Sequence, residues 1–163
     1  MKSVLIALLL SILLIFSSGM TSYAQDFEKG LRAYKSGDFT AALTEWMPLA
    51  EQGKVGAQNN LALMYSKGQG VAQDHEEAAK WFLKAAEQGY ADAQYNLASL
   101  YATGQGVIQN DLDAHMWWSI AAANGDDDAA YNRGVLEKKM SSSQISEAQK
   151  LARECVAKEY EGC

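Results

Sequence analysis

The two histidines are the side chains of this sequence that could most readily bind a metal ion. His75 precedes Glu76 and Glu77, as at the start of a zinc-protease helix. That helix needs a second histidine four residues later, so that both imidazoles share one face. Alanine stands at position 79, and His115 has no matched ligand set beside it. We therefore expect no metal site, with His75 at an exposed helix start and His115 packed or half-exposed.

Motifs for nucleophilic or nucleotide chemistry are also missing. The sequence contains no Gly-x-Ser-x-Gly, Ser-x-x-Lys or Lys-Thr-Gly, which excludes an esterase elbow and a penicillin-binding serine of known pattern. Gly-Gln-Gly-Val occurs twice, at 68–71 and 104–107, but the third glycine of a dinucleotide fingerprint and the lysine of a phosphate-binding loop are absent. The sequence predicts no enzyme activity and no cofactor.

The two cysteines, Cys155 and Cys163, lie near the end of the chain. Eight residues of continuous helix would separate their Cα atoms by about 12 Å, whereas a disulfide needs roughly 4.4 to 6.8 Å. A disulfide is favoured, and it requires the helix to end between the cysteines, where Glu161-Gly162 offers a chain reversal. A redox pair is the alternative, although Cys-x-x-Cys is absent.

An acidic run could bind a cation or begin a helix. A calcium loop spreads its ligands over twelve residues and ends in glutamate, which this run does not do. Carboxylates just before a helix stabilise the positive end of its dipole, so a solvated helix cap is the favoured interpretation. The residues concerned are Asp126, Asp127 and Asp128.

A repeat of 36 residues must position the histidines and the acidic run. Residues 57–92 align with 93–128 without a gap, and nearly half of the positions are identical. Each unit opens with Ala-Gln-x-Asn-Leu-Ala-x-x-Tyr, whose apolar residues have helical spacing, and we name this helix A. A second stretch of alanines and aromatic residues is helix B. The Gly-Gln-Gly-Val turn between them lets helix A end, because glycine adopts positive φ without steric cost.

The repeated pattern resembles the Sel1-like repeat family, relatives of the tetratricopeptide repeats, over about 27–140. The motifs are Ala-x-x-x-Leu-x-x-x-Tyr, Gly-x-Gly-Val and Ala-x-x-Trp-aromatic-x-x-Ala-Ala-x-x-Gly. The resemblance implies an all-α fold, a right-handed αα superhelix of about eight helices, and an adaptor or scaffold without catalysis. A cysteine-rich branch of the family is associated with penicillin binding, so an envelope hydrolase or β-lactam binder is the alternative. That branch has paired cysteines within each repeat, and this chain has none there.

The ends of the chain suggest export. A basic start, an apolar run at 4–16 and a small-x-small site at 22–24 are typical of a signal peptide, so we expect a periplasmic or secreted protein without a membrane span after cleavage. The expected segments are a signal peptide at 1–24, a shortened repeat at 27–56, repeats at 57–92 and 93–128, and a half repeat with a capping helix at 129–163.

The charge distribution indicates the kind of partner. The formal net charge is -6, which argues against nucleic acid. No Lys or Arg occurs from 85 to 132, so a protein or peptide partner, basic in character, is expected there; the oligomeric state stays open. We expect Asn59, Tyr95 and Tyr131 to face outward on helix A and, with Asp126, Asp127 and Asp128, to contact the partner. One place later, Asn60, Asn96 and Asn132 are expected to form a buried column.

Overall fold

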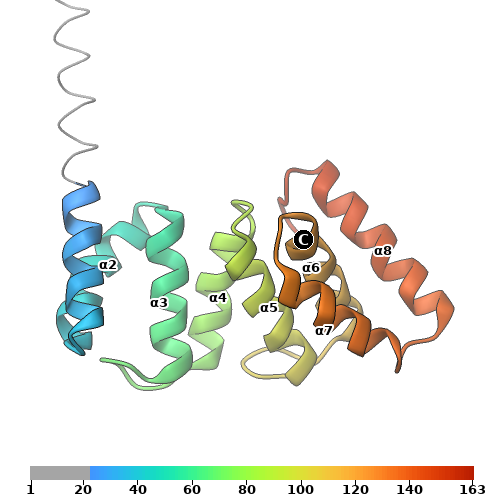
Figure 1. Cartoon of the computed structure of the whole chain (residues 1–163), viewed down its shortest axis with the longest axis horizontal. Coiled ribbons are helices and arrows are strands. Elements are labelled where there is room, and N and C mark those ends of the chain that lie inside the picture. Colours follow the sequence, from blue (N-terminus) through green and yellow to red (C-terminus); the bar gives the residue numbers. More distant parts are fainter. Residues whose placement is uncertain (1–22) are drawn as a thin grey trace, which may run out of the picture.

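The protein is described by a computed structural model, which places residues 23–163. In this part of the chain, a helical segment at 23–35 precedes seven helices, and there is no strand. The helices are α2 (Phe39–Glu51), α3 (Val55–Lys67), α4 (His75–Ala86), α5 (Ala91–Thr103), α6 (Asp111–Ala123), α7 (Asp127–Glu137) and α8 (Ser142–Ala157). They follow one another along the long axis of the molecule (Figure 1). The predicted all-helical repeat array is confirmed.

The predicted signal peptide lies outside the described residues, except for Tyr23 and Ala24 in the first helical segment. From residue 23 onward, no helix combines the length and apolar character that crossing a bilayer requires.

The Gly-Gln-Gly-Val turns end helices α3 and α5 and also join neighbouring units. Gly68 and Gly104 cap these helices in the left-handed conformation, with φ of 66° and 70°. The second glycine of each turn lies against the start of the preceding helix B. A Cβ at Gly70 would be 2.8 Å from the carbonyl of Phe39, and a Cβ at Gly106 would collide with the main chain of His75. Each turn therefore closes over the helix start of the unit before it.

Buried glutamines of helix A connect the units, a role that the sequence analysis did not assign. The Gln58 side chain, 4% exposed, donates to the carbonyl of Ala50 at the end of α2, and Gln88 donates to Gln58. The pattern repeats 36 residues later: buried Gln94 donates to the end of α4 and accepts from Asn124. These bonds satisfy the amides and the helix-end carbonyls together.

The last unit is built differently. In the earlier units, helices A and B pack as hairpins, α3 with α4 and α5 with α6, whereas α8 packs on α6. Figure 1 shows α8 diverging from α7 at the C-terminal end of the array.

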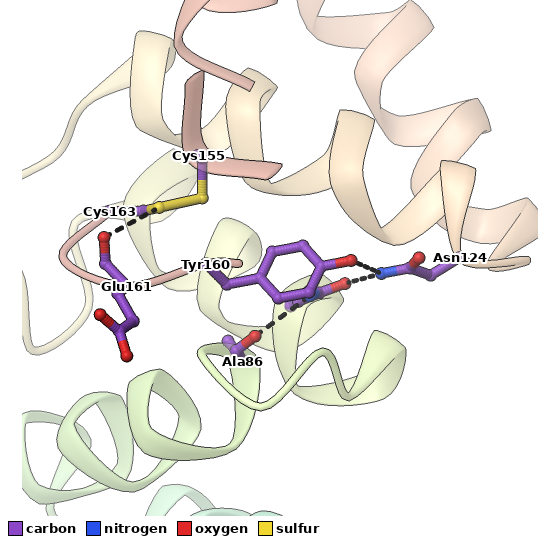
Figure 2. The surroundings of a disulfide bond; sticks show 7 residues. Ala86, Asn124, Cys155, Tyr160, Glu161 and Cys163 are labelled. Atoms are coloured by element: carbon purple, nitrogen blue, oxygen red, sulfur yellow. Dashed lines mark hydrogen bonds between the residues drawn. A yellow bond between two sulfur atoms is a disulfide. The ribbon is translucent and has the colours of Figure 1, made fainter. Parts of the chain in front are cut away.

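The chain reverses direction after α8 and is closed by a disulfide. Cys155 and Cys163 are joined, with their Cα atoms 5.5 Å apart. The reversal begins at Glu159 and Tyr160, which have positive φ, two residues before the expected Glu161-Gly162. It brings the Tyr160 ring over Gly89, and Asn124 donates to the Tyr160 hydroxyl at 3.5 Å (Figure 2).

Candidate functional site

The outer face of α7 carries large exposed apolar side chains. Tyr131 is 72% exposed and Val135 is 39% exposed. Asp127, also exposed, lies four residues before Tyr131. Side chains four residues apart are neighbours on a helix. We call Asp127, Tyr131 and Val135 the α7 face.

A hollow with acidic walls adjoins the start of α7. Its volume is about 440 Å³, and its lining residues are Ala91, Asp92, Asn124, Gly125, Asp126, Asp127 and Asp128. Asp126 is the N-cap of α7 and accepts from the amide of Ala129 at 2.8 Å, whereas Asp127 and Asp128 lie exposed in the first turn. The helix-cap interpretation thus fits Asp126. Asp127 belongs to the α7 face, and the Asp128 carboxylate lies next to it in the first turn of the helix.

The prediction that Asn59 faces outward is wrong. Asn59 is only 4% exposed, and its Oδ1 is buried without a hydrogen-bond partner. Tyr95, at the same repeat position, is half-buried, and its hydroxyl accepts from Asn132 of α7 at 3.0 Å. The position faces the next helix A along the array. Tyr131 is exposed because α7 is the last helix A within the described residues.

The expected buried column of asparagines is also wrong. Asn60, Asn96 and Asn132 are all half-buried. Asn96 donates to the carbonyl of Asp92 in its own helix, and Asn132 donates to Tyr95. The Asn96 amide therefore bonds within its own helix, and the Asn132 amide connects α7 to α5.

Asp113 differs from the other acidic residues of this region. It is half-buried in the first turn of α6 and accepts from the Asn110 side chain at 2.6 Å. Burial raises the pKa of Asp113, and the Asn110 hydrogen bond opposes that increase. This carboxylate belongs to the helix start and not to the exposed acidic surface.

His115 is fully buried and links α6 to α7. Its Nε2 lies 2.8 Å from Oε1 of Glu137, and its Nδ1 lies 3.3 Å from the Ser119 hydroxyl. Arg133 Nε is 3.5 Å from the same Glu137 oxygen. His75 is the first residue of α4 and is half-buried. From residue 23 onward, no group of three or more His, Cys, Asp or Glu is arranged to hold a metal ion.

The sequence analysis missed this cluster, although the repeat contains a signal for it. Arg133 stands where the two regular units have Leu61 and Leu97, and Glu137 stands where they have tyrosine. His115 replaces an alanine of the preceding unit. Polar residues at the apolar positions of a repeat mark the place where its packing changes.

A second hollow, which we call the α6–α8 hollow, lies beside this cluster. Its volume is about 360 Å³, and residues of α6, α7 and α8 line it. Most of the lining is apolar, and two arginines contribute its basic groups, Arg133 from α7 and Arg153 from α8.

Comparison with known proteins agrees with this architecture. The Sel1 repeat family matches residues 55–90 and 91–126, two residues ahead of the units aligned above. A Sel1 repeat protein from Oxalobacter formigenes is 32% identical, with a TM-score of 0.66 over 78% of this chain and 55% of that chain. The protective antigen c5321 of uropathogenic Escherichia coli, which displays an SLR fold, is 27% identical, with a TM-score of 0.79 over 88% of this chain and 32% of that chain.

One curated relative has a named role. The exopolysaccharide production negative regulator of Rhizobium leguminosarum bv. viciae is 43% identical over 54 residues, which is 33% of this chain and 20% of that protein. The chain thus spans a fifth to about half of the length of these three relatives. Sel1 repeats generally mediate protein–protein interactions, and their fold is typically a non-catalytic scaffold. With two matched repeats at its centre and the fold of solved Sel1 proteins, this chain is a Sel1-like repeat protein.

Proposed function

We propose that the chain is an exported adaptor or scaffold without catalytic activity, and that a protein partner docks on the α7 face. The observation that carries this proposal is the exposure of Tyr131. The equivalent Tyr95 is covered by the next helix A, whose Asn132 bonds to it. A partner that packs on α7 would cover Tyr131 in the same way.

The composition of the α7 face suits protein recognition. Tyr131 offers a large apolar ring and a hydroxyl group, and Val135 extends the apolar area by one helical turn. Tyrosine is enriched among the residues that dominate binding energy at interfaces. The exposed apolar side chains of α7 therefore favour a protein partner.

The surrounding charge favours a basic partner. Asp92, Asp127 and Asp128 line the hollow beside the α7 face, and no Lys or Arg occurs from 85 to 132. Opposite charges raise association rates, and salt weakens this steering. Export is inferred from the first 24 residues. The relative that regulates exopolysaccharide production supports a regulatory role in the cell envelope.

The test uses exported protein as bait in an envelope extract, followed by binding kinetics with the captured partner. Replacing both Tyr131 and Val135 by alanine should raise the dissociation rate at least tenfold. Replacing Asp127 and Asp128 by asparagine should slow association and flatten its salt dependence, while Asp126 is kept because it caps α7. Ile108→Ala is the matched control, because Ile108 is 90% exposed but lies outside this face.

Two results would contradict the proposal. The first is a partner whose kinetics are independent of salt and unaffected by both sets of substitutions while the helices stay intact. The second is covalent labelling or turnover of a labelled β-lactam by the purified protein, which would support the alternative of a β-lactam binder. Mass spectrometry of exported protein should give Gln25 as the first residue. A retained N-terminus would contradict cleavage at 24.

A further inference from the structure

The α6–α8 hollow has an apolar floor and basic walls. Ile120 and Ala123 of α6 and Ala152 and Val156 of α8 supply apolar surface. Val156 is 48% exposed, although it lies next to a buried cysteine. A pocket of about 360 Å³ is within the usual size range of ligand and side-chain pockets, roughly 300 to 1,000 Å³.

The repeat explains why this hollow exists. In the two regular units, a leucine of helix A and a tryptophan of helix B are buried in the core: Leu61 and Trp81, then Leu97 and Trp117. In the last unit Arg133 takes the place of the leucine, and Ala148 takes the place of the tryptophan, seven residues after the helix N-cap. Burying the Arg133 guanidinium group in an apolar hairpin would cost free energy, because the group would lose water. Accordingly α8 packs on α6, and the space next to α7 stays open.

Within the described residues, the positive charges of the two arginines are not fully paired. Glu137 lies 3.5 Å from Arg133 Nε, but the same oxygen is also 2.8 Å from His115. Arg133 Nε is buried and has no hydrogen-bond partner. Arg153 is exposed and has no ion pair within residues 23–163. In a chain of net charge -6, this makes the hollow a local basic site.

We propose that the α6–α8 hollow binds an acidic segment of a partner protein that inserts an aliphatic side chain. The aliphatic group would cover Ile120, Ala152 and Val156, and the adjacent carboxylate would pair with Arg133 and Arg153. Guanidinium groups are well suited to carboxylates because they can form two parallel hydrogen bonds. This inference is independent of the α7 face, which has the opposite charge.

A defined peptide tests the proposal. The probe is a fluorescein-labelled, C-terminally amidated octapeptide, Gly-Ser-Leu-Glu-Ile-Asp-Leu-Gly, and fluorescence anisotropy measures its binding to the exported protein. Two control peptides separate the contributions of charge and apolar area. One carries Gln and Asn in place of Glu and Asp, and the other carries Ser in place of Leu and Ile. Both controls should bind at least tenfold more weakly than the probe.

Protein variants locate the binding. Arg153→Gln should weaken binding at least tenfold without changing the helical content, because Arg153 has no ion pair within residues 23–163. Ala123→Trp should fill the hollow and weaken binding by a similar factor. Lys150→Gln is the matched control, since Lys150 lies on the same helix, pairs with Glu147 and Glu154, and does not line the hollow. It should change the affinity less than twofold, as should Tyr131→Ala.

Several results would overturn the proposal. Unchanged affinity in Arg153→Gln, or an equal loss in Lys150→Gln, would show that the hollow is not the site. Octanoate that binds as tightly as the peptide would assign the hollow to a small amphipathic carboxylate. Ile108, which is 90% exposed, is the apolar side chain that a second copy of the chain could insert into the hollow. Self-association that is abolished by Ile108→Ser would therefore assign the hollow to a second copy.

Discussion

Helices α5 and α6 form a closed hairpin, whereas α7 and α8, the corresponding pair of the last unit, do not. Both first helices have an alanine-rich start, and both second helices have a side-chain N-cap, but Ser141 follows Asn110 by only 31 residues because the last unit lacks the Gly-Gln-Gly-Val turn. The pairs also differ at core positions, where Leu97, Tyr101 and Trp117 become Arg133, Glu137 and Ala148. The comparison teaches that a turn and a few core side chains decide whether a unit closes on itself or leaves surface exposed.

The largest effect is expected from a comparison of one substitution in α6 with one in α8. Trp117 is fully buried, so Trp117→Ala should lower the free energy of unfolding by about 3 to 5 kcal/mol. Arg153→Ala in α8 should change it by less than about 0.5 kcal/mol, because this side chain is exposed. Urea denaturation followed by circular dichroism measures both values. Similar losses in the two variants would refute the proposed difference between the units.

The second prediction concerns the turns that join the units. Gly106 has φ of 70°, and a Cβ there would collide with the main chain of His75. Gly106→Ala should therefore cost about 2 to 5 kcal/mol, the sum of the left-handed conformation and the steric overlap. Gly125→Ala is the control: φ is 99°, but nothing lies within 4 Å of the added atom. It should cost only about 1 to 2 kcal/mol. A larger loss at Gly125 would contradict the joining role of the Gly-Gln-Gly-Val turn.

The smallest expected effect is that of reducing the disulfide. Opening the short loop between Cys155 and Cys163 should cost about 2 to 3 kcal/mol. Because each unit of a repeat array contacts chiefly its neighbours, the loss should be concentrated in α8 and the tail. Amide hydrogen exchange should show faster exchange there and unchanged protection in α3. Loss of protection throughout the array, or free thiols in exported protein, would contradict this prediction.

The sequence predicted the features that depend on local chemistry. Glycines at the ends of α3 and α5 have the positive φ that their turns require, and Asp74 and Asn110 cap the helices that follow. The exposure of the proposed partner-binding residues was harder to predict. Asn59 and Tyr131 share one repeat position, and their opposite exposure arises because only one of them has another helix A beside it. The departure at Arg133 was visible in the sequence, but the open hollow depends on how α8 packs.

The contact between Tyr160 and Gly89 has a consequence for the order in which the chain folds. Most contacts in this protein are between neighbouring helices, so each unit can form as soon as its own residues have been synthesised. The tyrosine ring near the C-terminus lies over the turn between α4 and α5, some 70 positions earlier in the chain. That turn is therefore covered only after residue 160 has been synthesised. A chain that lost its final few residues would have a defect at its centre as well as at its end.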